Sequence, residues 1–284
     1  MKRFTGWWAS RQSLAQNLFW VRKPLGSAMP DSITRSIEFA AAEADHGPLA
    51  LDLHRSAIGG PVVLYVHGGG FARGARDDNE ARLQALASHG ITVATIDYRL
   101  SPAATYPDPI DDVHRAVRFL RAHAAELDIE ANRIGAIGAS AGGYLTSMAA
   151  LTPPDAESSI DAVSAWYAPT DLWTSTRRSP LENFLSPATF EANLLGSVDD
   201  PAHLRATSPS LQDLTDAPPF LFVHGDRDRW VLPQQSDFFH EALQRYGRSS
   251  TFLRVGGAGH EDPAFDSGPV PAMVGAWFVA MLHQ

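Results

Sequence analysis

Short apolar runs recur along most of this 284-residue chain, separated by longer segments of mixed polarity. Eight runs have the composition of strands: Thr34–Ala40, Ala50–His54, Val62–Val66, Ile91–Ile96, Arg133–Ile137, Ala162–Tyr167, Phe220–Val223 and Thr251–Val255. The first two, joined by a turn at residues 46–48 (HGP), indicate an antiparallel pair. The later runs are apolar nearly throughout and alternate with helical segments, which is typical of parallel strands covered on both faces. The pattern predicts an α/β fold with a mostly parallel eight-stranded sheet and helices on both faces.

The segment that begins at Asp108 has a clear helical pattern. Asp108 is expected to cap the helix, and Pro109 fits the first helical position, where a missing N–H costs nothing. The apolar residues that follow form a stripe that should face the core, made of Ile110, Val113, Val117 and Leu120. A second helix is expected over Tyr144–Leu151, directly after a glycine-rich stretch.

Two segments do not fit the regular alternation of strands and helices. In residues 1–30, Trp7, Leu14, Leu18 and Val21 fall on one helical face, so we expect an amphipathic helix that docks on the body or serves as a cap. Residues 169–219 carry several prolines and aromatic residues, and they look like a cap-like insertion of short helices and loops. We therefore expect one domain over residues 1–284, with these two segments added to its body and contributing aromatic residues to a pocket.

Charge and composition narrow the range of partners. A net charge of −9 and a pI near 5.6 argue against nucleic-acid binding, so the default partner is a small molecule. The absence of cysteine excludes a disulfide scaffold, a thiolate zinc site and a cysteine nucleophile, and it favours the cytoplasm. Arg11 and Gln12 interrupt any signal-peptide core, and no run approaches the ~20 apolar residues of a membrane span. We therefore expect a soluble protein without stable membrane insertion; the sequence leaves a homodimer open.

Two glycine-rich loops follow predicted strands. His67-Gly68-Gly69-Gly70-Phe71 comes after the third run, and its glycines allow backbone N–H groups to approach a ligand closely. Residues 138–142 (GASAG) match the G-x-S-x-G pattern, with a strand before them and a helix after them. In an open α/β sheet, ligands bind outside the carboxyl ends of the strands, so both loops are expected at one site.

A serine hydroxyl near pH 7 needs a base, and the base needs a group that fixes its tautomer. Residues 224–231 (HGDRDRWV) follow the seventh strand and supply two acids, Asp226 and Asp228. Residues 256–260 (GGAGH) follow the last strand and supply His260. The chain order is serine, acid and histidine, as in α/β sheet enzymes of this kind, and Asp171 after the sixth strand is a more remote acid.

Five motifs occur in order: HGGGF at 67–71, DYRLSP at 97–102, GASAGG at 138–143, HGDRDRWV at 224–231 and GAGH at 257–260. Together they resemble the α/β-hydrolase carboxylesterases, near the hormone-sensitive-lipase-like and bacterial feruloyl-esterase-like branches, over about residues 60–265. Ala139, and an acid loop without the D-P-L-x-D form, place the chain nearer the second branch.

The resemblance implies an α/β-hydrolase fold with a small cap and assigns a role to each site residue. Ser140 is the nucleophile, His260 the general base, and Asp228, rather than Asp226, the acid, since the family pattern is similar to H-G-x-x-D-x-x-V. The oxyanion hole is formed by the backbone N–H groups of Gly69, Gly70 and Ala141. The remaining residues hold the loops: His67 and His224 keep loop shape, Asp226 shapes a turn, and Asp97 with Arg99 forms a network that supports the glycine loop.

The expected function is a serine carboxylesterase that hydrolyses short-acyl or aryl esters through an acyl-enzyme. Its partner is a small-molecule ester, and no metal or organic cofactor is expected, since neither a phosphate-loop pattern nor H-E-x-x-H occurs. Amide hydrolysis by the same triad, as in a peptidase or an aryl-formamidase, is an alternative. A non-catalytic ligand-binding protein on the same fold is a second, although such proteins usually lose a triad member.

Overall fold

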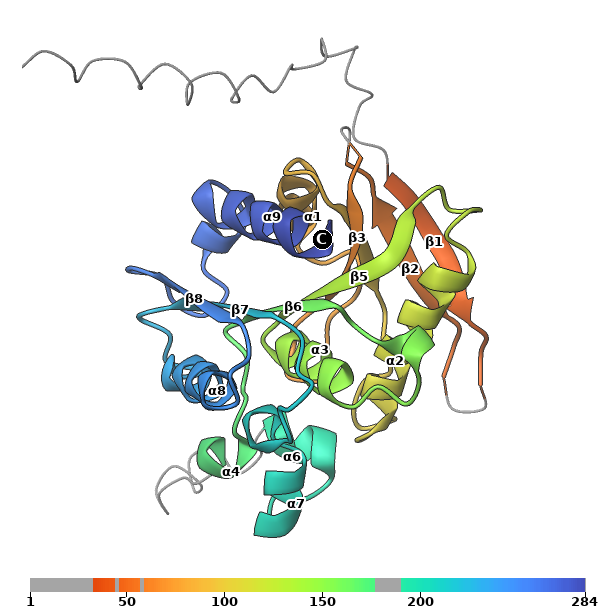
Figure 1. The fold of residues 1–284 in the computed structure, drawn as a ribbon. Helices are drawn as coiled ribbons and strands as arrows, with labels where there is room; N and C mark the ends of the chain where they lie inside the picture. Colours follow the sequence, from red (N-terminus) through yellow and green to blue (C-terminus); the bar gives the residue numbers. More distant parts are fainter. Residues whose placement is uncertain (1–32, 44–45, 57–58, 177–189, 284) are drawn as a thin grey trace, which may run out of the picture.

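The computed structural model describes residues 33–43, 46–56, 59–176 and 190–283. The helix expected over residues 1–30, with its docking or cap role, lies outside the described residues. All eight predicted strands are present: β1 Ile33–Ala40, β2 Leu49–His54, β3 Pro61–Val66, β4 Thr92–Ile96, β5 Glu130–Ala139, β6 Ala162–Trp166, β7 Phe220–Gly225 and β8 Ser250–Val255. They form one sheet in the order β1-β2-β4-β3-β5-β6-β7-β8 (Figure 1). The predicted eight-stranded sheet is therefore confirmed.

The directions of the strands follow the hydrophobic pattern. β1 pairs with β2, and β2 with β4, in antiparallel fashion, whereas the pairs from β4 to β8 are all parallel. Every residue of β3, β4, β6 and β7 is buried, as expected for strands with a helical layer on each side. The more exposed β1 forms one edge of the sheet.

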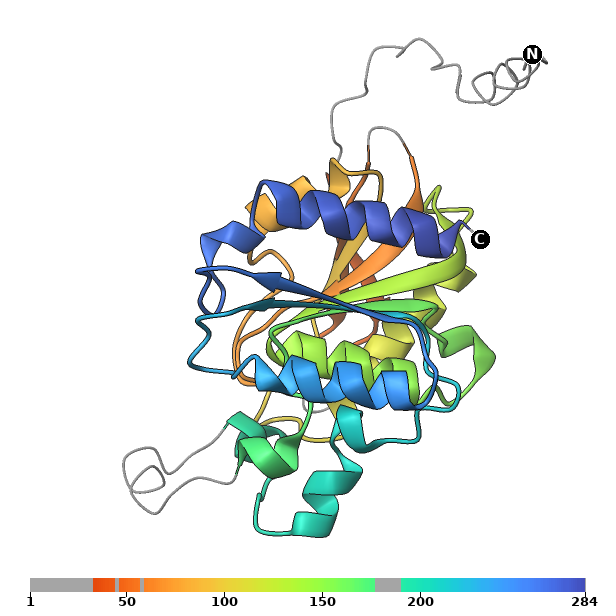
Figure 2. The same cartoon turned by 60° about the vertical axis from the view of Figure 1, so that its left-hand side comes forward.

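Helices cover the sheet on both faces (Figures 1 and 2). On one face lie α1 (Glu80–Ala87) and α9 (Pro269–Leu282), which contact each other. On the other face lie α2 (Asp108–Ala122), α3 (Ala141–Leu151) and α8 (Gln234–Arg245). Each face has its own cluster of buried apolar side chains, so the sheet separates two cores.

The start of α2 corrects one expectation. The helix begins at Asp108 itself, the capping position is Pro107, and no side chain caps it there. The carboxylate of Asp108 instead lies 3.5 Å from the guanidinium of Arg99. Its charge in the first turn still complements the helix dipole. The predicted apolar stripe is confirmed, since its four residues are all buried.

The described part of residues 169–219 contains short helices and no strand: α4 (Leu172–Ser175), α6 (Phe190–Leu195), α7 (Pro201–Ala206) and a 3₁₀ turn at Pro209–Leu211. Figures 1 and 2 show these helices together on one side of the α/β body, beyond α3 and α8. Local capping defines their starts, because Asp171 accepts a hydrogen bond from the N–H of Thr174 and Asp200 accepts one from Ala202. The short helices expected in this segment are present.

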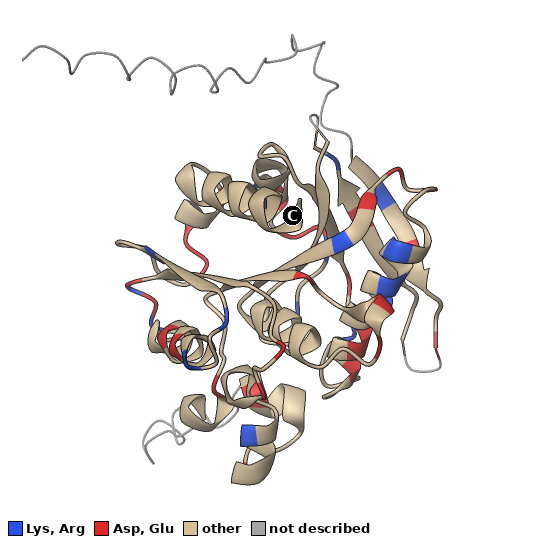
Figure 3. Ribbon diagram, viewed as in Figure 1, with Lys and Arg blue, Asp and Glu red and all other residues tan. Residues whose placement is uncertain are grey.

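Residues of both charges occur along α2 and in its surroundings, as the colours of the ribbon in Figure 3 show. Arg115, Arg118 and Arg121 on α2 each contact a carboxylate from another segment.

One apolar stretch, residues 263–282, is long and apolar enough to cross a membrane by length and composition, contrary to the expectation of no such run. It consists mostly of α9, which buries Val270, Val274 and Phe278 against the sheet.

Candidate active site

Ser140 lies in a tight turn between β5 and α3. β5 ends at Ala139 and α3 begins at Ala141, so Ser140 alone connects the strand to the helix. Its backbone angles, φ 53° and ψ −117°, lie in a region that residues other than glycine rarely adopt. The Ser140 N–H donates to the carbonyl of Trp166 on β6 at 2.9 Å, which holds the turn against the sheet. The serine is thus presented at the carboxyl end of β5 in a strained conformation.

Glycines around Ser140 allow this turn to form because no side chain would fit. A Cβ atom on Gly142 would lie 2.0 Å from the carbonyl oxygen of Val66, and one on Gly138 would lie 2.1 Å from the carbonyl oxygen of Gly142. Both distances are far below van der Waals contact. The glycines in the GASAGG stretch therefore bring strand, helix and the neighbouring loop close together around one hydroxyl.

The strain at Ser140 leads to a prediction about stability. We expect Ser140→Gly to be more stable than Ser140→Ala by about 1 kcal/mol. Glycine relieves about 1–3 kcal/mol of backbone strain in the folded protein, and it loses about 0.5–1 kcal/mol because the unfolded chain has more conformational freedom. Urea unfolding of both variants measures the difference. The control is Ala141→Gly, at a helical position without strain, which should be destabilising. A Ser140→Gly variant less stable than Ser140→Ala would contradict the prediction.

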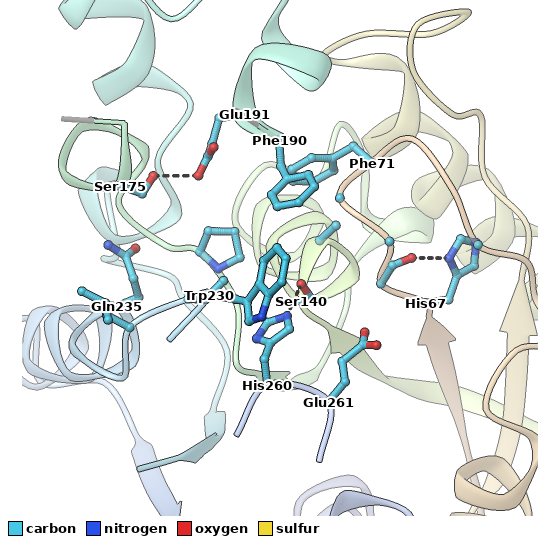
Figure 4. A pocket seen from close by; sticks show the side chains of 18 of the residues that line it. His67, Phe71, Ser140, Ser175, Phe190, Glu191, Trp230, Gln235, His260 and Glu261 are labelled. Carbon is cyan, nitrogen blue, oxygen red and sulfur yellow. Dashed lines mark hydrogen bonds between the residues drawn. The ribbon is translucent and has the colours of Figure 1, made fainter. Parts of the chain in front are cut away.

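The structure brings His260 between Ser140 and Asp228. Its Nε2 lies 2.9 Å from the Ser140 hydroxyl oxygen, and its Nδ1 lies 2.6 Å from Oδ2 of Asp228. A carboxylate can only accept a hydrogen bond, so Nδ1 carries the proton and Nε2 accepts from the hydroxyl. Figure 4 shows the His260 ring beside Ser140 in the cleft. This tautomer is the one that a general base needs.

Asp228 is buried and its carboxylate is fully engaged. Oδ1 accepts hydrogen bonds from the backbone N–H groups of Trp230 and Val231, at 2.8 and 3.0 Å, while Oδ2 meets His260. Burial alone would raise the pKa of Asp228. The hydrogen bonds from His224, His260 and the Trp230 N–H outweigh it and hold the pKa of this carboxyl well below its usual range. Asp228 therefore stays ionised throughout the neutral range.

The other two acids have different partners. Asp226 accepts a hydrogen bond from the N–H of Gly257 at 2.6 Å and links the β7 turn to the loop after β8. Asp171 caps α4. Asp228 is thus the acid that the fold brings to His260, whereas Asp226 links two loops.

His224 holds the loop that carries Asp228. Its Nε2–H donates to the carbonyl of Val231 at 2.9 Å, and its Nδ1 accepts from the hydroxyl of Ser236 at 2.8 Å. Nε2 also lies 3.3 Å from Oδ2 of Asp228. These contacts agree with the expected role in loop shape.

The glycine loop after β3 faces the same hydroxyl. Gly69 and Gly70 have φ values of +118° and +62°, which residues other than glycine rarely adopt. Together with Ala141 and Ser140 they line one cleft. No described residue accepts a hydrogen bond from the backbone N–H of Gly69, Gly70 or Ala141. Three donors are therefore available beside the serine.

The residues that hold the glycine loop in place are not the ones expected from the sequence. Asp97 accepts a hydrogen bond from the Arg76 N–H at 3.1 Å, whereas Arg99 binds Asp112 on α2 at 2.8 Å, so the two belong to separate networks. The expected joint network of Asp97 and Arg99 is wrong, because each side chain reaches a partner on a different neighbouring segment.

The supporting residues are those next to them in the DYRLSP stretch. The Tyr98 ring stacks on His67 at 4.4 Å and its hydroxyl donates to the His67 carbonyl, while the Ser101 N–H donates to the Phe71 carbonyl. His67 Nδ1–H in turn donates to the carbonyl of Gly68 at 2.7 Å. Sequence reasoning identified the stretch but not these contacts, which depend on how the two loops meet.

The cleft has a volume of about 1230 Å³. Large apolar side chains stand at its rim, from the insertion, from the loop between β7 and α8, and from α8 itself: Phe190, Trp230, Leu232 and Phe238. Figure 4 shows Trp230 and Phe190 next to the Ser140 and His260 side chains. The insertion thus contributes an aromatic residue to the pocket as expected, while Trp173 packs under the guanidinium of Arg205 instead. Within the described ranges, no group of three or more His, Asp or Glu residues is placed to hold a metal ion.

Comparison with known proteins identifies the family of this chain. The model of the BD-FAE family matches residues 51–243, which include the serine turn, the acid loop and the glycine loop. The chain belongs to the BD-FAE family. The expected resemblance to α/β-hydrolase carboxylesterases is therefore confirmed.

Two relatives from Mycobacterium tuberculosis are similar to this BD-FAE family member. Esterase LipC is 32% identical over 79% of this chain and 59% of its own length. The probable carboxylic ester hydrolase LipM is 32% identical over 70% of this chain and 47% of its own length. The chain thus spans less than two thirds of the length of both relatives.

A solved structure supports the fold of this BD-FAE family member. A truncated form of a carbohydrate esterase from gut microbiota superposes with a TM-score of 0.79 at 24% identity, covering 91% of this chain and 99% of that one. The α/β-hydrolase fold predicted from the sequence is confirmed.

Proposed function

We propose that the protein is a serine carboxylesterase. The observation that carries the proposal is the continuous hydrogen-bonded series Asp228, His260, Ser140, with distances of 2.6 and 2.9 Å, beside three backbone donors without a described acceptor. Membership of the BD-FAE family and the names of the similar proteins, which are esterases, support the same reaction. In this proposal Ser140 is the nucleophile, His260 the base and Asp228 the orienting acid.

The reaction proceeds in two halves. Ser140 Oγ forms a bond to the ester carbonyl carbon as its proton passes to His260 Nε2, and the carbonyl electron pair moves onto oxygen. The tetrahedral intermediate collapses, the alcohol leaves with the proton from His260, and Ser140 holds the acyl group. Water then attacks the acyl carbon with its proton taken by His260, and the acid is released as Ser140 regains its proton.

The backbone donors supply the largest single stabilisation. In this proposal the N–H groups of Gly69, Gly70 and Ala141, which line the same cleft as Ser140, hold the negative oxygen of the intermediate, and each such donor is worth about 10²–10³ in rate. Gly69 and Gly70 have positive φ angles, and Ala141 is the first residue of α3, so the fold itself holds the backbone at all three positions. The proposed oxyanion hole consists of backbone groups alone. A side chain at Gly69 would place its Cβ atom 2.0 Å from the carbonyl oxygen of Arg73, so a substitution there would displace the loop that carries two of the donors.

The cleft favours small esters with an apolar or aryl part. Trp230 is 73% exposed and stands with Phe190 at the rim, so it can cover an apolar group bound beside Ser140. The substrate class we propose is short-acyl or aryl carboxylic esters.

Matched p-nitrophenyl esters and p-nitroanilides with acetyl, butyryl and octanoyl groups test the reaction and the acyl length. We expect ester turnover with a burst of nitrophenol, fastest for the shorter acyl groups, and anilide turnover slower for every acyl group. Mass spectrometry after reaction with an organophosphonate should place the label on the peptide that contains Ser140. Faster anilide turnover would indicate an amide hydrolase, and absence of both turnover and label would indicate a non-catalytic protein.

A further inference from the structure

Arg82 on α1 is a buried cation that the proposed reaction does not use. Its side chain is 1% exposed, and its guanidinium is surrounded by partners from three segments. Nη1 donates to the hydroxyl of Tyr65 on β3 at 3.1 Å and to the hydroxyl of Tyr167 after β6 at 2.8 Å. Nε donates to Asp266, six residues after His260, at 2.9 Å. The guanidinium also lies 5.5 Å from the ring centre of Trp166.

Two of these partners lead directly to the His260 imidazole. The Tyr167 ring packs against the His260 ring in an edge-to-face arrangement, with centroids 4.8 Å apart. Asp266 lies at the end of the 3₁₀ turn Pro263–Phe265, so its ion pair with Arg82 fixes the segment that follows His260. The guanidinium is therefore connected to the imidazole both through the Tyr167 ring and through the backbone after His260.

The cost of this arrangement points to a positioning role. A buried cation is expensive to desolvate, and an apolar side chain in its place is often neutral or stabilising. Tyr167 also holds a left-handed backbone, φ 36°, which a non-glycine residue rarely adopts. The buried cation and the strained backbone both lie at Tyr167, whose ring packs against His260. A network that only filled the core would not need a charge there.

We propose that Arg82 is a positioning residue for His260. It fixes the Tyr167 phenol, whose ring supports one side of the imidazole, and through Asp266 it fixes the loop that carries the imidazole. Arg82 touches neither substrate nor the reacting atoms. This inference rests on the proposed function, because the positioning has a kinetic effect only if His260 acts as the base.

A matched pair of variants tests the proposal. Tyr167→Phe and Tyr65→Phe each remove one buried hydroxyl from the same guanidinium nitrogen and keep the ring. Among the described residues Tyr65 makes no ring contact with His260, so only Tyr167→Phe should release the imidazole. We expect kcat on p-nitrophenyl acetate to fall about tenfold or more for Tyr167→Phe, since small misplacements of a catalytic group are costly, with KM nearly unchanged. Tyr65→Phe should keep kcat within about twofold.

Thermal unfolding separates a kinetic effect from a structural one. Both variants lose the same kind of hydrogen bond, so their melting temperatures should fall by similar amounts. A core-filling network would give equal changes in stability and no difference in kcat between the variants, which would overturn the proposal. The rate of organophosphonate labelling at Ser140 gives a second readout and should slow only in Tyr167→Phe.

Two further variants keep the proposal testable if a single change disturbs folding. Asp266 lies at the partly exposed end of the network, and Asp266→Asn should lower kcat by a larger factor than it raises KM. The triple variant Arg82→Met, Tyr65→Phe, Tyr167→Phe replaces the polar network with apolar groups, and we expect it to fold and to show reduced kcat. A triple variant with wild-type kcat would refute the role of Arg82. If the wild-type protein itself neither turns over esters nor takes the label, the proposed function fails instead.

Discussion

Replacement of Ser140 by alanine is expected to lower ester turnover by about 10⁶ while the fold stays intact, as for the loss of a nucleophilic serine elsewhere. The reason is chemical, since without Oγ no acyl-enzyme forms and His260 has no hydroxyl to deprotonate. The backbone of the turn does not depend on the hydroxyl: the Ser140 N–H still donates to the Trp166 carbonyl, and the Ser140 carbonyl still accepts from Gly143. The residual rate comes from the backbone donors and from substrate binding.

The measurement is kcat on p-nitrophenyl acetate with circular dichroism and thermal unfolding of the same preparation. Ser147→Ala is a matched control, because Ser147 is also buried in α3 and its hydroxyl donates to the Gly143 carbonyl at 2.6 Å. It should change stability slightly and activity little. A Ser140→Ala variant that kept more than about 1% of wild-type turnover would remove Ser140 from the nucleophile role.

The sheet could be predicted from the sequence because its strands are buried on both faces. β3, β4, β6 and β7 are buried throughout and each produces a nearly continuous apolar run, and such runs between helical segments have few alternative structures. The start of α2 could not be placed as well. Aspartate is a common capping residue, but the carboxylate of Asp108 forms an ion pair with Arg99, which lies in the preceding loop. Ends of elements depend on such tertiary contacts, whereas their interiors depend on periodicity.

The residues of the candidate site were predictable for a similar reason. Ser140, Asp228 and His260 each follow the carboxyl end of a different strand, and the topology places these ends at one edge of the sheet. The supporting contacts were not predictable, since Arg82, Tyr65 and Tyr167 carry no motif and meet only when three segments pack. Asp97 and Arg99 show the opposite case, in which neighbours in a motif point to separate partners.

Asp228→Asn is expected to lower kcat by about 10⁴, whereas Asp226→Asn should change it by no more than about twofold. At position 228 the two oxygens have separate partners: Oδ1 accepts from the N–H groups of Trp230 and Val231, and Oδ2 accepts from His260. An asparagine that keeps the backbone bonds must present its NH₂ group to His260. Nδ1 then accepts, the proton moves to Nε2, and the imidazole cannot receive the proton of Ser140.

The comparison of the two variants separates the effect of His260 orientation from the effect of losing a negative charge in this loop. Asp226 uses Oδ1 to accept from the Gly257 N–H, and an asparagine can do the same, so the turn should survive that change. Both substitutions remove one negative charge from the same loop, and kcat on p-nitrophenyl acetate compares them directly. Equal losses would mean that charge rather than tautomer matters, and a larger loss for Asp226→Asn would move the acid to that residue. The expected asymmetry follows because only Asp228 fixes which nitrogen of His260 carries the proton.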